Sequence, residues 1–460
     1  MYFCINYSNM IESITIKNFM CFKKETEISF VASNKEKSEE DLFWFNEINN
    51  KRILRLVILS GLNGSGKSAA LEAIRRLCLI ATLRSVLDID PVFASEGFKY
   101  DEETINQPSE VGLIYYIGNN RYEYKLNMGD EDLYEEELKL MNGRPSLLFR
   151  RTCENGKVNI KFGNDLKISK SKRDLIKKWT RSNESVLSVA GDLLKEHDVL
   201  SENYLFFDIM SSHIKISPIP SYSIYNLLCE RYNYHIDETK KSFVLSALNG
   251  IGTGIVDYHF EDFNSDALFI EPKEVQQYCI NQFEKKKKYL HLDIDYNING
   301  QIYGIRSYNN PQGIIDIIQF FAHFYDLFLD KGVATFDDFG KGIHPKLISF
   351  VLKTYLCLSS DCQILVATNN TSILDLDFMR RDALRLVEKS VDGTATIRRF
   401  PYLHKTMSLF RAYNKEIGSS IDIIMEENNF NKHMEPLKEI MEPFGVGIDS
   451  ETYKKKYLDQ

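Results

Sequence analysis

Several features that would place this 460-residue chain in a special class of protein are missing. No run of about 18 apolar residues occurs, so no transmembrane helix is predicted. Residues 1–10 lack a basic segment followed by an apolar one, which argues against a secretion signal and favours a cytoplasmic protein. The eight cysteines form no CxxC pair and have no histidine cluster beside them, so we expect reduced thiols rather than a zinc site or disulfides.

The chain also lacks a net positive charge. Its 57 Lys and Arg against 65 Asp and Glu give a formal charge of −8, which offers no general field for nucleic acid or an anionic membrane. A DNA contact would need a local basic patch. The strongest basic run, at 285–288, is expected on a solvated helix end. No heptad pattern is sustained, so a long coiled coil is not expected.

What the chain does contain is a complete phosphate-binding loop, GLNGSGKS, at 61–68. The apolar run 53–59 before it predicts a buried strand, and residues 69–80 after it have the apolar spacing of an amphipathic helix. Glycines in such a loop let the backbone N–H groups turn towards phosphates. The predicted ATP-binding residues here are Asn63, Gly64, Ser65, Gly66, Lys67 and Ser68.

Each of these residues has an expected role. Lys67 would reach the β- and γ-phosphates, and the Ser68 hydroxyl would bind Mg²⁺. Two later strands are predicted to end in polar residues. The first, at 332–336, runs into Asp337 and Asp338, and the second, at 362–368, runs into Asn369. Asp337 would hold Mg²⁺ and Asp338 would polarise the attacking water. Taken alone, a strand followed by two carboxylates is equally compatible with a structural turn.

In this order the motifs resemble those of the ABC-type ATPases of the RecF, SMC and OLD kind, which are AAA-family ATPases. Within them the chain is most similar to stand-alone anti-phage ATPases of bacteria related to RloA and to the AriA subunit of PARIS. The motifs that carry the resemblance are NFxxF at 18–22, GLNGSGKS at 61–68, DDxxxxxHP at 337–345 and TxNTxxLD at 368–375.

The resemblance implies that two ATPase heads pack head to tail in a homodimer or higher homo-oligomer. A signature segment of one head then reaches the γ-phosphate of the other, and Gly313 has the spacing of its glycine. Three residues depart from the family pattern: Pro311 replaces a Ser, Asp338 replaces a Glu, and Asn369 replaces a His. All three act at the γ-phosphate, so slow hydrolysis is expected. Ordinary ATPase activity through Asp338 and Asn369 stays open as the alternative.

For the fold, we expect an α/β protein: an ABC-ATPase head, with a β-rich N-terminal subdomain beside the phosphate-loop sheet, and an inserted helical lobe. Residues 1–168 are predicted to hold the loop and a β-meander, and 169–264 the helical lobe. Residues 265–400 would hold the signature, Walker B and switch segments, and 401–460 a helical tail. Residues 33–50 are predicted to be a loop with a hydrophobic anchor at 42–45.

Three functions remain open, of which the least specific is a housekeeping ATPase that recycles a protein substrate. The first is an ATP-loaded sensor or scaffold of an anti-phage complex that controls a separate effector protein, either a toxin or a nuclease. The segment after Asn369 is too short for the nuclease domain that OLD-type enzymes carry, so we expect that effector on another polypeptide. The second is a RecF- or SMC-like ATPase that clamps DNA. The aromatic runs at 204–207 and 222–234 are interpreted as core or, less favoured, as a docking surface.

Overall fold

The computed structural model describes residues 9–33, 43–83, 96–130, 132–193, 198–215, 237–262, 290–306, 309–359, 361–400 and Tyr413. Contacts divide the chain into the units Met1–Pro401 and Tyr402–Gln460. The predicted tail at 401–460, the lysine run 285–288 and the aromatics of 222–234 lie outside the described residues, apart from Tyr413. Within the described ranges, no helix is long and apolar enough to cross a bilayer.

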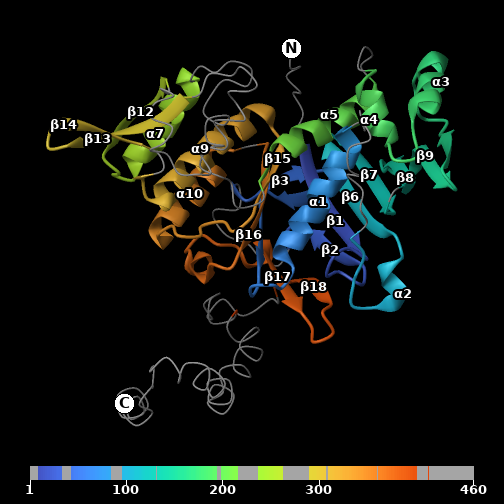
Figure 1. Cartoon of the computed structure of the whole chain (residues 1–460), viewed down its shortest axis with the longest axis horizontal. Coiled ribbons are helices and arrows are strands. Elements are labelled where there is room, and N and C mark those ends of the chain that lie inside the picture. Colours follow the sequence, from blue (N-terminus) through green and yellow to red (C-terminus); the bar gives the residue numbers. More distant parts are fainter. Residues whose placement is uncertain are drawn as a thin grey trace, which may run out of the picture. The chain divides into compact units, whose positions relative to one another are not determined.

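One sheet of six strands carries the phosphate-binding loop (Figure 1). Its order is β11 (Ile214–Lys215), β15 (Val333–Phe336), β16 (Gln363–Thr368), β5 (Leu56–Ser60), β17 (Leu384–Lys389) and β18 (Ala395–Arg399). The first five are parallel, and β18 is antiparallel to β17. Every residue of β5, β15 and β16 is buried, as is typical of parallel strands covered on both faces. The three strands predicted around the motifs are therefore confirmed.

Helix α1 (Lys67–Thr82) follows the loop as predicted and contacts β16 of this sheet as well as β1 and β6 of a second one. Helices α9 (Gln312–Asp330) and α10 (Pro345–Leu358) pack against each other. Aromatic rings join them to the sheet. The ring centroid of Phe324 lies 6.0 Å from that of Phe336 in β15 and 5.3 Å from that of Tyr355 in α10. Strand β15 is thus held by an aromatic core.

The second sheet is antiparallel and has seven strands, in the order β10-β9-β8-β7-β6-β1-β2. The predicted meander after the first helix is confirmed as β6 (Ser109–Ile117), β7 (Asn120–Met128), β8 (Leu133–Leu140), β9 (Ser146–Glu154) and β10 (Lys157–Phe162). Strands β1 (Asn9–Lys17) and β2 (Thr26–Ser29) complete it. The β9–β10 turn is Asn155-Gly156, with φ of 51° and 72°. Asn-Gly is a preferred residue pair for a two-residue hairpin turn, which needs a positive φ at both positions.

Two glutamates lie inside this sheet with opposite pKa shifts. Burial alone would raise the pKa of Glu12, but hydrogen bonds from Arg121, Lys51 and Tyr116 outweigh it and lower the pKa to about 2. Burial raises the pKa of Glu136 to about 7, even though Val186 N donates to it at 2.6 Å. Both side chains are satisfied within the protein and hold the sheet together.

The two sheets are joined by the buried side chain of Gln363 in β16. Its Oε1 accepts from Ile11 N at 2.7 Å, and its Nε2 donates to Ile11 O at 3.0 Å and to Leu54 O at 2.8 Å. A buried amide with these partners leaves no donor or acceptor unpaired at the contact between β1 and β16. The contact therefore fixes one sheet against the other.

The region 169–264 holds the helices α3 (Lys170–Trp179), α4 (Val186–Gly191), α5 (Val199–Ser212) and α7 (Glu238–Gly250). Helices α4 and α5 contact α1, and β11 follows α5 directly, so this part of the segment packs against the two large sheets and is not a separate lobe. Strand β12 (Ile255–Asp262) then pairs with β13 (Leu290–Ile298), which pairs with β14 (Gln301–Arg306). The boundaries predicted for the lobe stay a prediction.

One finer expectation is corrected. Residues 33–50 are not all loop, because β3 (Phe45–Ile48) and β4 (Lys51–Leu54) form a hairpin. Its turn residues Asn49 and Asn50 have φ of 49° and 62°, a conformation that Asn tolerates better than most residues. Of the anchor predicted at 42–45, Trp44 is 1% exposed, whereas Phe43 is 44% exposed and residue 42 lies outside the described residues.

For the aromatic run 204–207, the favoured interpretation as core is confirmed at two positions. Phe206 and Phe207 are buried, and the Phe206 ring stacks on Tyr115 of β6 at 4.4 Å. These two rings therefore belong to the core, and the docking interpretation is wrong for them.

Candidate functional site

Three parallel strands deliver the predicted site residues to one edge of the six-stranded sheet. The loop at 61–68 leaves β5, Asp337 leaves β15 and Asn369 leaves β16, and Thr368 is in register with Ser60. Because parallel strands end on the same side, ligands of such sheets bind in this position. The amide of Asn369 donates to Asn63 Oδ1 at 2.8 Å, so residues 306 positions apart in sequence meet here.

The backbone of the loop at 61–68 leaves no room for a side chain at two of its glycines. A Cβ at Gly61 would lie 2.2 Å from Val387 O, and one at Gly66 would lie 2.8 Å from Cys21 Sγ. Gly64 and Gly66 have φ of 77° and 116°, which L-residues rarely adopt. Gly66 is also the N-cap of α1 and gives that helix no side-chain cap. The first turn of α1 thus presents N–H groups where an anion can bind.

Lys67 is held inside the loop. Its side chain is buried, and Nζ donates to Gly61 O at 2.8 Å and to Leu62 O at 2.9 Å. Burial lowers the pKa of Lys67, while the nearby carboxylates of Asp337 and Asp338 act to raise it. The cation is therefore held by two carbonyls of the loop and interacts electrostatically with both carboxylates.

The turn after β15 fixes the two carboxylates differently. Asp337 N donates to Lys215 O of β11 at 3.0 Å, and Asp337 Oδ1 accepts from Asp338 N at 3.0 Å. Asp338 has a φ of 49°, in the left-handed region where Asp and Asn are enriched among residues other than glycine. Its Oδ2 lies 3.4 Å from Lys341 Nζ. The left-handed backbone at position 338 thus favours Asp over the longer Glu.

Backbone contacts tie this turn to the end of β16. Phe339 N donates to Ala367 O at 2.9 Å, and the Thr368 hydroxyl donates to Phe339 O at 2.8 Å. Asp338 and Asn369 are therefore carried by two segments that are hydrogen-bonded to each other. Ser68, with an exposed side chain on the first turn of α1, completes the set of predicted polar groups.

Gly313 lies elsewhere. It is the second residue of α9, and a Cβ there would be 3.1 Å from Gly342 O, in the turn that follows Asp338. The N-cap of α9 is Pro311, which provides no side-chain cap, and both Pro311 and Gln312 are exposed. The structure therefore places Gly313 at an open helix N-terminus beside the carboxylate turn rather than within the loop at 61–68.

A pocket of about 360 Å³ opens beside the loop, and sequence reasoning missed it. It adjoins Gly64 and the residues 66–69, and its other walls are formed by Met20, Cys21, Glu96, Lys99, Tyr100 and Lys389. We call it the side pocket. Asn18 Oδ1 accepts from Phe98 N at 3.0 Å and Cys21 O accepts from Ala395 N at 2.7 Å, which brings its three wall segments together. The NFxxF motif at 18–22 was the one usable signal.

The residues of this edge fit a nucleoside triphosphate with Mg²⁺. The glycine loop and the uncapped α1 can bind phosphates, and Lys67 can neutralise them. No group of three or more His, Cys, Asp and Glu side chains in the described part of the chain could hold a metal by itself. Mg²⁺ usually takes one or two protein oxygens together with phosphate oxygens, and Ser68 and Asp337 offer such oxygens.

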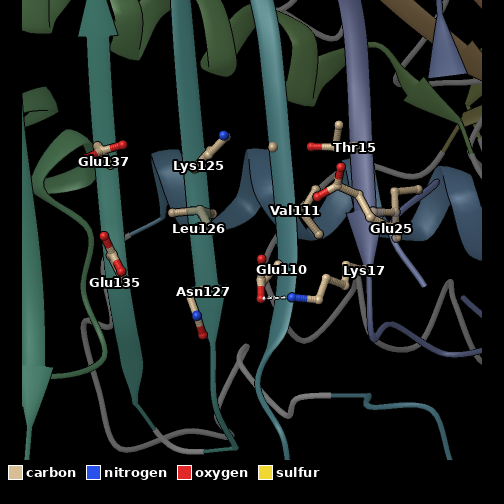
Figure 2. Close-up of a pocket in the computed structure, with 12 residues that line it drawn as sticks. Thr15, Lys17, Glu25, Glu110, Val111, Lys125, Leu126, Asn127, Glu135 and Glu137 are labelled. Carbon is tan, nitrogen blue, oxygen red and sulfur yellow. Dashed lines mark hydrogen bonds and ion pairs between the residues drawn. The ribbon is translucent and has the colours of Figure 1, made fainter. Parts of the chain in front are cut away.

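Another pocket, of about 140 Å³, lies on the seven-stranded sheet and shares no residue with the loop (Figure 2). Two of its carboxylates are paired across strands: Glu110 lies 2.7 Å from Lys17 Nζ, and Glu135 lies 2.5 Å from Arg150 of the neighbouring strand. Such cross-strand pairs stabilise a sheet. We assign this face no ligand.

Comparison with known proteins supports part of this description. A family model described as AAA domain matches residues 13–208, which include the loop at 61–68 and α1. No curated protein matches the chain. Among solved structures, the SmcHead bound to the C-winged helix domain of ScpA is 13% identical, with a TM-score of 0.41, and the match covers 85% of this chain and 97% of that chain.

Two further solved structures match at similar levels. The SMC head domain from Thermotoga maritima is 12% identical, with a TM-score of 0.39, over 85% of this chain and 100% of that chain. The Smc head domain with an extended coiled coil, bound to the C-terminal domain of ScpA derived from Pyrococcus furiosus, is 11% identical, with a TM-score of 0.39, over 90% and 99%. What the comparisons add to the geometry is that residues 13–208, which carry the phosphate-binding loop, are similar to an AAA domain.

Proposed function

We propose that the protein is an ABC-type ATPase that binds ATP with Mg²⁺ and hydrolyses it slowly. One observation carries most weight: the glycine loop, Asp337 and Asn369 meet at the ends of three neighbouring parallel strands. In this assignment the loop and Lys67 hold the triphosphate, and Ser68 and Asp337 hold Mg²⁺.

Slow hydrolysis is supported by the groups that face the terminal phosphate. Asp338 would accept the proton of the attacking water, but its carboxylate is short and lies 3.4 Å from the Lys341 ammonium. Asn369 can orient that water by a hydrogen bond and cannot titrate near neutral pH. Because one lost transition-state contact costs on the order of 10² in rate, these features together favour a long-lived ATP complex.

We infer that the working unit is a head-to-tail dimer or a higher oligomer. The exposed first turn of α9 at Pro311 and Gly313 supports this, because an open helix N-terminus suits the γ-phosphate of a second protomer. Proline has no N–H to donate, so the contact would depend on the N–H groups that follow it.

For the biological role, we propose a sensor or scaffold subunit of a cytoplasmic anti-phage complex in bacteria, whose ATP state controls a separate effector. The motif order from 18–22 to 368–375 supports this role, since it resembles that of bacterial defence ATPases. A DNA clamp is the competing role, and the formal charge of −8 disfavours it.

Native mass determination of the protein purified from its own host tests this role. ATP and Mg²⁺ are present in one preparation and removed in a matched one, and Lys67→Ala protein serves as the control. An ATP-dependent oligomer that contains a second polypeptide in fixed ratio is the expected result. A nuclease-sensitive complex with DNA and no protein partner would instead establish the clamp.

A further inference from the structure

The site has two chemically different ends. At one end, Asp337 and Asp338 interact electrostatically with Lys67, and Asn369 is hydrogen-bonded to Asn63; the γ-phosphate is expected here. The side pocket contains none of these three residues. It begins at Gly64 and the residues 66–69, where phosphates would lie, and extends from there to Tyr100 and Lys389. In a phosphate loop the Lys reaches the β- and γ-phosphates while backbone N–H groups hold the α- and β-phosphates. The part of the ligand beyond the α-phosphate therefore points into the side pocket.

The size and walls of the side pocket suit a nucleoside. About 360 Å³ is within the range of small-ligand sites, roughly 300 to 1,000 Å³. Tyr100 is 68% exposed although its ring lines a pocket, and Lys389 Nζ lies 5.4 Å from the ring centroid. A Cβ at Gly393 would come within 2.7 Å of this ring, so the glycine leaves the space in which the ring lies. The β17–β18 hairpin thus positions the Tyr100 ring at the pocket wall.

We propose that Tyr100, held by Lys389 and Gly393, is the stacking platform for the base of the bound nucleotide. This inference rests on the proposed function, since it assigns the nucleoside end of the same ligand. Every base has a flat π-face, and stacking on an exposed aromatic ring strengthens binding without reading hydrogen bonds. Glu96 also lines the pocket, but its carboxylate already lies 3.0 Å from Arg76, so we assign it no role in base reading.

Two consequences distinguish a stacking platform from a merely structural tyrosine. Purines have the larger ring system, so ATP and GTP should bind more tightly than CTP and UTP. Inorganic tripolyphosphate has no base, so its affinity should not depend on Tyr100 at all.

Calorimetric titration of the full chain with ATP, UTP and tripolyphosphate, each with Mg²⁺, tests the proposal. The proteins are the wild type, Tyr100→Ala, Tyr100→Phe and the control Tyr303→Ala, whose ring is 48% exposed on β14. Tyr100→Ala should weaken ATP binding roughly ten- to a hundredfold, weaken UTP binding less and leave tripolyphosphate binding unchanged. Tyr100→Phe and Tyr303→Ala should bind all three ligands like the wild type.

The alternative outcomes are separable. Equal ATP affinity in the wild type and in Tyr100→Ala overturns the platform and leaves the proposed function standing. A parallel loss of ATP and tripolyphosphate affinity in Tyr100→Ala also overturns it, because the phosphate loop itself has then been disturbed. If the wild type binds tripolyphosphate and ATP equally, the side pocket takes no base. A wild type that binds neither ligand refutes the proposed function together with the platform.

Discussion

The two large sheets differ in how far their polar side chains are buried and paired. In the seven-stranded sheet, Glu12 and Glu136 are buried and each has several partners inside the protein. At the end of the six-stranded sheet, Asp338 and Asn369 are half-buried or exposed and each has one weak or exposed side-chain contact. Satisfied interior charges hold a fold together, whereas open groups at strand ends are available to a ligand. Substitutions in the two regions should therefore change different properties.

The largest effect is expected at Lys67. Lys67→Ala should weaken ATP binding by about 100-fold or more, because it removes the partly buried cation that faces the phosphates. The melting temperature without nucleotide should change little, since the side chain contacts only two loop carbonyls. Calorimetry and thermal unfolding measure the two quantities. The control is Lys125→Ala in the seven-stranded sheet, whose side chain is 53% exposed. Unchanged ATP affinity in Lys67→Ala would defeat the site assignment.

A second test separates hydrolysis from binding. Asp338→Asn should lower the rate of phosphate release by about 10² while ATP affinity stays within about twofold. Asn tolerates the φ of 49° as well as Asp does, so the turn should keep its shape. Asp377→Asn, at a side chain that is 79% exposed, is the matched control. If the two variants hydrolyse ATP equally fast, Asp338 does not act on the water.

The third test removes a buried charge from the seven-stranded sheet. Glu12→Gln should lower the free energy of unfolding at pH 7 by about 2 kcal/mol, because Arg121 and Lys51 lose their carboxylate. The folded pKa of Glu12 is about 2, below the ordinary 4.5, so its contribution is present above pH 4.5 and is lost as the pH falls towards 2. The wild-type and variant unfolding energies from urea titrations should therefore converge towards pH 2. A large fall in ATP affinity would contradict the division between the sheets.

The smallest effect is expected at Glu136, with the opposite sign. Its folded pKa of about 7 exceeds 4.5, so its contribution is fully present below pH 4.5 and is lost as the pH rises through 7. Between pH 5.5 and 7.5 the unfolding free energy of the wild type should fall by about 1 to 2 kcal/mol more than that of Glu136→Gln. Urea titrations across this range measure the difference. Parallel pH profiles would show that Glu136 keeps one charge state throughout.

Local patterns in the sequence were enough to predict the centre of the six-stranded sheet. The apolar runs before Gly61, Asp337 and Asn369 gave β5, β15 and β16, and the apolar period after Lys67 gave α1. The meander was predictable for the same reason, since alternating runs separated by turn residues mark hairpins. These elements are determined by residues that are neighbours along the chain.

Other features depend on contacts between distant segments. Strand β11 has two residues, which is too short for any period, and it exists because β15 offers its edge. The side pocket needs Tyr100 and Lys389 to meet, and no local pattern links them. The left-handed backbone at Asp338 is set by the closing of its turn, so the sequence alone left the short carboxylate as an unexplained departure. Sheet order and turn closure are tertiary properties.

The buried amide of Gln363 has a consequence for the alignment of the site. Its three hydrogen bonds to Ile11 and Leu54 repeat the pattern of a peptide group, so the side chain works like one extra backbone unit inserted between strands. Sliding β16 by one residue would move this unit away from both partners and turn the side chains of the strand to the wrong faces. The position of Asn369 at the strand end is therefore fixed by Gln363, which lies in the protein interior and outside the candidate site.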